Sequence, residues 1–133
     1  MNTSSTKSLR WHLRRSQIDF NALVREKGTC ERCGADQGLH CSHCYTVKAY
    51  PNLRFNVFNV CCLCWECHAW WHAEQKLAWS WFKSKHPDRY EILQQIKNIY
   101  HKYNIPELLQ LQEYIKNKDL QKLIIPLDIT TLS

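Results

Sequence analysis

The sequence lacks any apolar run that approaches the roughly 18 to 20 residues a membrane-spanning helix requires. It also lacks internal repeats and low-complexity segments, and its first seven residues are polar, without the apolar run of a signal peptide. Hydrophobic residues make up 44% of the 133 positions and charged residues 23%, which is typical of a folded globular protein rather than a disordered one. We therefore expect one soluble domain located in the cytoplasm.

A large excess of charge of one sign is also missing. The formal net charge is +6 and the pI is about 8.9, which gives a modest attraction to polyanions such as DNA or RNA. Before the first cysteine, six Lys and Arg residues face two acidic ones, so this segment carries +4 of the total. Its basic residues alternate with Trp11 and His12, which suits an arm along a phosphate backbone and, equally well, a solvated basic arm. The candidates for DNA contact here are Arg10, Arg14 and Arg15.

Eight cysteines stand out against this background. Without a signal peptide they are expected to be thiols in a reducing cytosol, many of them bound to metal. Two CxxC pairs, Cys30 with Cys33 and Cys64 with Cys67, are separated by thirty residues. Each pair forms a tight turn that presents both sulfurs to one point, so the four thiolates are predicted to hold one structural Zn²⁺. Such a site has no open coordination position and cannot activate water.

Hydrophobic periodicity predicts an α+β protein that is mainly helical. Ser16 is the expected N-cap of a first helix. The predicted elements after it are an extended segment at 39–47, a strand at 57–63, a helix from Cys64 that continues through 73–85, and helices starting at Pro87 and Pro106. The chain is thus divided into a basic N-terminal arm and helix (1–29), a zinc-stapled core (30–73) and a helical extension (74–133), all within one compact domain. Apolar stripes on the last helices would permit a homodimer.

Four further side chains in or just after the stretch between the two CxxC pairs are candidates for catalysis or metal binding. His68 and His72 are four residues apart, which places them on one face of the predicted helix, where they could grip a second cation. His43 has an ordinary pKa near 6.5, which makes it a usable base at neutral pH. Asn59 could orient that imidazole through its side-chain amide.

The order of these residues, with a CxxC pair near each end, resembles the zinc-stapled HNH endonucleases of the ββα-metal fold, which have a small treble-clef-like core. Sixteen positions separate His43 from Asn59, nine separate Asn59 from His68, and four more lead to His72. The segment 51–60, together with Cys-Ser-His at 41–43, is similar to the branch of this family that contains the NinG-type phage recombination proteins. For a phage-encoded member, the expected location is the host cytoplasm.

The resemblance implies a metal-dependent DNA endonuclease. Its substrate would be double-stranded or branched DNA, and hydrolysis of the phosphodiester bond would leave a 5′-phosphate and a 3′-hydroxyl. The resemblance implies that His43 is the general base and that Asn59 holds it in place. His68 and His72 would bind the catalytic ion, which would be Mg²⁺, Mn²⁺ or Ni²⁺, and Arg54 would contact a phosphate of the DNA.

The sequence departs from the family pattern at Ser42. Many HNH enzymes carry Asp or His at this position, immediately before the base, as another ligand of the catalytic ion. Cys41 or His40 is a candidate replacement. Strand alternation puts Cys41, rather than His40, on the same face as His43.

A different arrangement of the cysteines remains open, in which the chain holds two zinc ions. In that arrangement one ion is bound by Cys30, Cys33, Cys41 and Cys44, and the other by Cys64 and Cys67 with Cys61 or Cys62 and His68 or His72. It would consume the catalytic histidines and make the protein a non-catalytic module that binds nucleic acid. In the one-zinc arrangement the remaining four cysteines are ordinary buried thiols.

Overall fold

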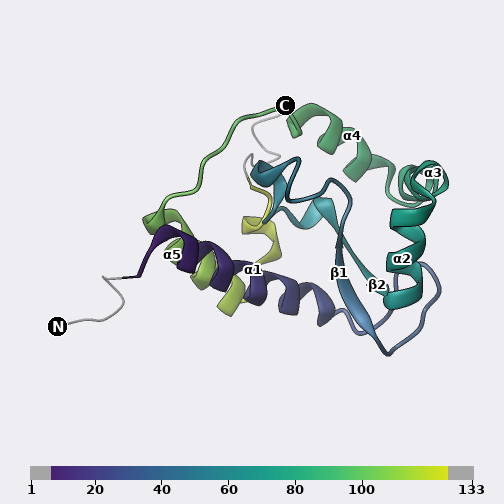
Figure 1. The fold of residues 1–133 in the computed structure, drawn as a ribbon, viewed down its shortest axis with the longest axis horizontal. Helices are drawn as coiled ribbons and strands as arrows, with labels where there is room; N and C mark the ends of the chain where they lie inside the picture. The colour runs from purple at the N-terminus through teal and green to yellow at the C-terminus, as the bar shows by residue number, and fades with distance from the viewer. Residues whose placement is uncertain (1–6, 126–133) are drawn as a thin grey trace.

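The structure is a computed structural model that describes residues 7–125. Within this range the chain forms five α-helices and one two-stranded antiparallel sheet, so the predicted class, a mainly helical α+β domain, is confirmed. No helix among the described residues is both long and apolar enough to cross a lipid bilayer. Figure 1 shows the helices on either side of the sheet.

Helix α1 spans Leu9–Arg25 and begins earlier than predicted. Its N-cap is Ser8, whose hydroxyl accepts a hydrogen bond from the Trp11 N–H at 3.1 Å. The prediction that Ser16 caps this helix is wrong, because Ser16 is buried within it and its hydroxyl accepts a hydrogen bond from Gln112 Nε2 at 3.1 Å. The basic N-terminal segment is therefore helical from residue 9 onward and is not an extended arm there.

The sheet pairs β1 (Leu39–His43) with β2 (Val60–Cys64). Leu39 lies opposite Cys64 and His43 lies opposite Val60, so the candidate base is the last residue of its strand.

Two short 3-10 turns lie in the connection between the strands, η2 (Pro51–Leu53) and η3 (Val57–Asn59). The strand expected over 57–63 therefore starts only at Val60. The physical reason is Asn56, whose side-chain oxygen accepts a hydrogen bond from the Phe58 N–H at 2.8 Å and caps η3.

Three helices follow β2 on one side of the sheet. Helix α2 (Trp65–Ala73) begins directly after the strand, as predicted. Its expected continuation through residue 85 is interrupted at Glu74, whose backbone angles of φ −122° and ψ 59° lie outside the helical region, and α3 (Gln75–Lys85) is a separate helix. Helix α4 (Pro87–Ile96) starts at the predicted proline.

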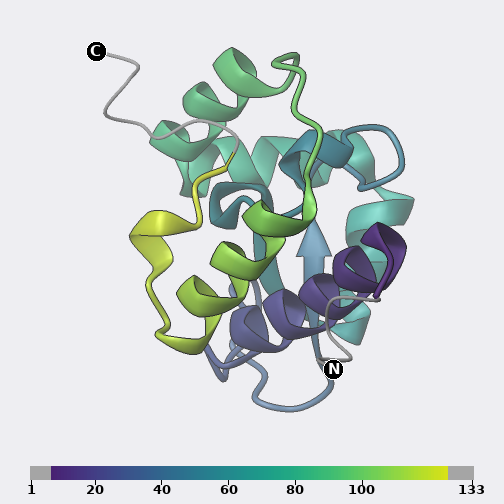
Figure 2. The same ribbon diagram turned by 90° about the vertical axis from the view of Figure 1, so that its left-hand side faces the viewer.

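The C-terminal part returns to the other side of the sheet. Helix α5 (Ile105–Lys116) carries Pro106 in its first turn, as predicted, and the short turn η4 (Leu120–Lys122) follows it. Asn104 caps α5 by accepting a hydrogen bond from the Glu107 N–H at 2.9 Å. Figure 2 shows α5 lying beside α1, with which it is in contact.

The buried side chains form two clusters, one on each side of the sheet. On the side of α2, α3 and α4, the largest are Trp71, Phe82 and Leu93. On the side of α1 and α5, Phe20 and Leu108 are fully buried. The sheet is thus clamped between two apolar layers, and the ends of its strands carry the candidate site.

Candidate functional site

The four cysteines of the two CxxC pairs come together as predicted. Their Sγ atoms all lie within 4.8 Å of one another, and the Sγ atoms of Cys33 and Cys64 are 3.6 Å apart. Sulfurs at the corners of a tetrahedron with zinc–sulfur bonds of about 2.3 Å would be roughly 3.8 Å apart. Cys30, Cys33, Cys64 and Cys67 therefore fit a structural metal such as Zn²⁺ in number, chemistry and spacing.

Local backbone structure explains why each pair converges. In the first pair the Cys30 N–H donates to the Ala35 carbonyl at 2.7 Å, and the Gly34 N–H donates to the Cys30 carbonyl at 2.9 Å. Gly34 has φ +80°, a left-handed conformation that glycine adopts without strain. In the second pair Cys64 is the N-cap residue of α2, so Cys64 and Cys67 flank the first helical turn.

The thiols of this group differ in how readily they ionise. Burial opposes ionisation of Cys30, but backbone hydrogen bonds from Cys33, Cys64 and Arg32 outweigh it and lower the pKa of Cys30 to about 6. Burial raises the pKa of Cys67 to about 12, against the hydrogen bond from Arg32 Nη1, which lies 3.4 Å from the Cys67 sulfur. Four clustered thiolates therefore need a cation to form together, which is consistent with a metal at this position.

Three histidines form a chain beside this group. The Nδ1 atoms of His40 and His68 are 2.9 Å apart, and the Nε2 atoms of His68 and His72 are 3.2 Å apart. Because His68 turns a different nitrogen toward each neighbour, the three rings are connected without converging on one point. Burial lowers the pKa of His68, and the nearby rings of His72, His40 and His43 lower it further. The neutral form of His68, which is the form that binds metal, is therefore favoured.

Strand alternation correctly puts Cys41, and not His40, on the same face as His43, but this face is turned away from the helical histidines, so Cys41 is not placed to replace the missing ligand. Cys41 and His43 face α1, where Cys41 packs in the cluster around Phe20. The opposite face of β1 turns toward α2, and His40 meets His68 there. Burial also raises the pKa of Cys41 to about 12, which makes it a poor ligand.

The imidazole of His43 is held by a backbone carbonyl. His43 Nε2 lies 3.1 Å from the carbonyl oxygen of Arg54. A carbonyl can only accept, so Nε2 carries the proton and Nδ1 keeps its lone pair. Burial lowers the pKa of His43, and this outweighs the Arg54 carbonyl, which acts in the opposite direction. The ring is therefore neutral at pH 7 and able to accept a proton at Nδ1.

Asn59 does not hydrogen-bond to the His43 ring, so the predicted direct contact is wrong. Its side-chain oxygen accepts from the Tyr45 N–H at 2.8 Å, and its Nδ2 donates to the carbonyls of Tyr45 at 3.0 Å and Leu53 at 3.3 Å. Asn59 is fully buried, and all of these partners are main-chain atoms. It therefore fixes the loop just before Arg54, whose carbonyl holds His43.

The predicted DNA-contacting arginines divide into two sets. Arg15 forms an ion pair with Asp19, with Nε 3.2 Å from the carboxylate. Arg10 and Arg14 line one groove together with Arg54. The side chain of Arg54 is fixed in turn, because its Nε donates to Gln17 Oε1 at 2.9 Å.

Comparisons with family models, curated proteins and solved structures find no match to this chain. Its function is therefore inferred from its own residues.

The ligand sets of the two-zinc arrangement do not form. Among the described residues, two groups of metal-ligand side chains are close enough together to hold an ion, and only the group of Cys30, Cys33, Cys64 and Cys67 matches a prediction. Cys44 is fully buried beside Cys61, and the two thiols interact with each other. The thiols of Cys41 and Cys44 are thus separated from Cys30 and Cys33, with which they would have to share a zinc.

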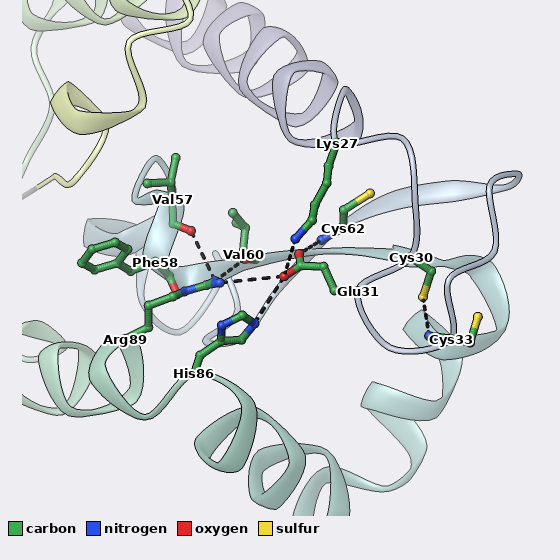
Figure 3. Close-up of polar contacts among 10 residues, drawn as sticks. All are labelled: Lys27, Cys30, Glu31, Cys33, Val57, Phe58, Val60, Cys62, His86 and Arg89. Carbon is green, nitrogen blue, oxygen red and sulfur yellow. Dashed lines mark hydrogen bonds and ion pairs between the residues drawn. The ribbon is translucent and has the colours of Figure 1, made fainter.

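The second group of metal-ligand side chains was not predicted from the sequence. It consists of Glu31, Cys61 and His86. The Glu31 side chain is only 5% exposed, and one carboxylate oxygen accepts from the Cys62 N–H at 2.5 Å. The other oxygen lies 3.3 Å from Lys27 Nζ and 3.3 Å from His86 Nε2, as Figure 3 shows.

Arg89 completes this network. Its Nη1 lies 3.9 Å from Glu31, and its Nη2 donates to the carbonyls of Val60 at 2.6 Å and Phe58 at 3.1 Å (Figure 3). Two cations, Lys27 and Arg89, already balance the Glu31 charge, so this group is a structural ion network that joins α4 to the turn of the first CxxC pair. Its members are up to 62 positions apart in sequence, which is why no local pattern reveals it.

Replacing Arg89 with alanine is expected to lower the free energy of unfolding by about 3–5 kcal/mol, because the buried Glu31 carboxylate loses one of its two cations and the carbonyls of Val57, Phe58 and Val60 lose their donor. Urea unfolding measures this loss. The control is Lys85→Ala, which removes an exposed cation near the end of α3 and should change stability by less than about 0.5 kcal/mol. Equal losses in both variants would show that Arg89 has no special structural role.

Proposed function

We propose that this protein is a metal-dependent DNA endonuclease of the HNH type, with a ββα-metal core formed by β1, β2 and α2. The observation that carries the proposal is a pair of histidines, His68 and His72, on the helix that begins at the four-cysteine group. His43 lies on the other, α1-facing side of β1, close enough for its charge to affect His68, and is held with one ring nitrogen free to accept a proton. No zinc-binding role accounts for these histidines, because the four thiols already form a complete ligand set.

The spacing of the helical histidines suits one shared ion. Two nitrogens at about 2.0–2.1 Å from a metal would be roughly 2.9–3.4 Å apart for bond angles between a right angle and a tetrahedral angle. The Nε2 atoms of His68 and His72 are 3.2 Å apart, within this range. His40 then meets the opposite nitrogen of His68, Nδ1, at 2.9 Å. A group in this position hydrogen-bonds to the ring nitrogen that does not bind the metal and so orients the ring. We therefore assign His40 to this orienting role instead of direct coordination.

The general base is His43. Its Nε2–H donates to the Arg54 carbonyl, which leaves Nδ1 to take the proton from an attacking water molecule. Asn59 contributes one step away from the ring, because it fixes the Leu53 carbonyl next to Arg54 in the chain. The guanidinium of Arg54 is a donor for a nearby phosphate oxygen, since only its Nε is used by Gln17.

A divalent ion held by His68 and His72 would supply positive charge that stabilises the negative charge developing on the phosphate during hydrolysis. Hydrolysis then leaves a 5′-phosphate and a 3′-hydroxyl. The chain's own contribution is proton removal by His43, for which general-base catalysis typically accounts for about 10²- to 10⁴-fold in rate.

The ligand chemistry favours some ions over others. Imidazole nitrogens suit Ni²⁺ and Zn²⁺, whereas Mg²⁺ prefers oxygen ligands. His68 and His72 supply nitrogen only, and Ser42 stands where a carboxylate ligand would otherwise lie. Activity should therefore be higher with Ni²⁺ than with Mg²⁺.

A cleavage assay on supercoiled plasmid and on a branched duplex tests the proposal. The zinc-containing protein is first treated with a mild chelator to remove exchangeable ions, and then Mg²⁺, Mn²⁺ or Ni²⁺ is added. We expect nicking that depends on the added ion, and products that DNA ligase reseals without prior phosphorylation. Absence of cleavage of both substrates with all three ions would refute the endonuclease.

A further inference from the structure

A groove of about 500 Å³ lies between helix α1 and the loop that carries Arg54. Three of the residues that line it are arginines, Arg10, Arg14 and Arg54, and none is acidic. Within residues 7–125, none of these three arginines forms an ion pair with a carboxylate. The groove therefore carries a concentrated positive charge that the described part of the chain leaves unbalanced.

The positions of the arginines on α1 are regular. Arg10 and Arg14 are four residues apart and so lie on one helical face, and Gln17 and Ile18 continue that face one turn later. Two like charges at this spacing repel each other by a few tenths of a kcal/mol. A helix that keeps such a pair beside a third arginine gains when an anion binds between them.

Arg54, the third arginine, is held in place by a side chain of α1. Gln17 Oε1 accepts from Arg54 Nε at 2.9 Å, and Gln17 Nε2 lies 3.4 Å from the Arg54 carbonyl oxygen and 2.9 Å from Asn21 Oδ1. This contact leaves the terminal nitrogens of the Arg54 guanidinium for an anion. Its carbonyl is the one that holds His43, so the groove adjoins the candidate base.

The rest of the lining is apolar. Leu13 and Ile18 line the groove between the arginines, and Ile18 is 51% exposed. A free inorganic anion makes no favourable contact with these aliphatic side chains. A sugar-phosphate backbone offers both an anion for the guanidinium groups and the less polar face of a sugar for the aliphatic side chains.

We propose that this groove binds the sugar-phosphate backbone of the DNA beside the bond that is cut, through Arg10 and Arg14 on α1 together with Arg54. The inference rests on the proposed function, which it extends by assigning part of the substrate to a helix outside the ββα core. An arginine guanidinium can donate two hydrogen bonds to the oxygens of one phosphate. Such contacts fix the position of the protein on the DNA but do not depend on the base sequence. The groove is therefore a sequence-independent clamp.

The test compares Arg14→Ala with Arg15→Ala, each in a His43→Ala background that prevents cleavage. The two substitutions remove the same charge from adjacent positions of α1, but only Arg14 lines the groove, whereas Arg15 is paired with Asp19. Binding of a fluorescein-labelled 20-base-pair duplex is followed by anisotropy at several salt concentrations. Thermal melting of both variants checks that they are folded.

We expect Arg14→Ala to raise Kd about tenfold and to reduce the slope of log K against log salt by about 1, as for one lost phosphate contact. Arg15→Ala should raise Kd less than about threefold. Equal effects of the two substitutions would refute the groove as the binding site and indicate that DNA is held only by diffuse electrostatic attraction. Displacement of the duplex by inorganic phosphate at millimolar concentration would also overturn it, because the groove would then be a site for a free anion.

The result is separable from that of the cleavage assay. A wild-type chain that cuts nothing but loses binding specifically in Arg14→Ala would refute the endonuclease and retain the clamp. A wild-type chain that cuts DNA, together with equal DNA binding by Arg14→Ala and Arg15→Ala, would support the endonuclease and refute the clamp.

Discussion

Replacing Cys33 with serine is expected to reduce the zinc content of the purified protein from one ion per chain to nearly none and to abolish its cooperative thermal unfolding. Cys33 is the exposed member of the four-cysteine group. Its side chain contributes almost nothing to core packing, so the loss reports on metal binding alone. Metal content by mass spectrometry and melting by circular dichroism measure the two effects.

The size of the expected effect follows from what a zinc ion at this site would contribute to the stability of the fold. Structural zinc sites have apparent binding free energies of about 10–16 kcal/mol at pH 7, which is comparable to or greater than the entire stability of a small domain. The sheet here has only two strands, and the four-cysteine group joins the turn before β1 to the end of β2 and the start of α2, all at one end of the sheet. A two-stranded hairpin is marginal by itself. The metal is therefore expected to hold the core together.

The control is Cys41→Ala. Cys41 lies in the same stretch but outside the four-cysteine group, on the α1 face of β1. This variant should keep one zinc per chain and melt within a few degrees of the wild type. Loss of zinc from Cys41→Ala, with retention in Cys33→Ser, would reverse the assignment of the ligands.

The zinc turns and the helical histidines could be predicted because their geometry is local. A CxxC pair determines where two sulfurs point within four residues, and positions i and i+4 of a helix determine that His68 and His72 are neighbours. Both predictions needed only a correct assignment of turn or helix. The start of α4 at Pro87 was predictable for the same reason, since proline suits the first turn of a helix.

The remaining contacts depend on which face of an element meets which neighbour. Alternation along β1 separates His40 from His43, but only the packing of α1 and α2 on opposite faces decides which of the two meets His68. Ser16 has the character of a cap, yet a glutamine 96 positions away satisfies its hydroxyl inside the helix. Asn59 likewise finds its partners in the main chain of a loop. Polar side chains have many partners available, and the tertiary fold selects among them.

Replacing His43 with alanine is expected to reduce the rate of DNA cleavage by about 10²- to 10⁴-fold, while DNA binding is retained. The alanine removes the nitrogen that accepts the proton and also the donor to the Arg54 carbonyl. A second variant, His43→Asn, keeps an amide N–H that can donate to that carbonyl but has no basic nitrogen. Both variants should be inactive in a plasmid-nicking assay, and His43→Asn should melt closer to the wild type. The control is His101→Ala, which removes a histidine that pairs with Glu107 at 2.7 Å in the α5 region.

The pH dependence of cleavage by the wild-type protein tests the same assignment, because protonation of the proposed base predicts in which direction the rate changes. Burial lowers the pKa of His43 below its ordinary 6.5, so the base is neutral and active above that lowered value and is lost by protonation as the pH falls through it. Cleavage should therefore rise with pH, reach half of its maximum below pH 6.5, and change little between pH 7 and 8. A half-maximum above pH 7, or unchanged nicking by His43→Asn, would show that a different group removes the proton. Because the Arg54 carbonyl keeps the proton on Nε2, the nitrogen that titrates in this profile is Nδ1, the one left free to face a water molecule.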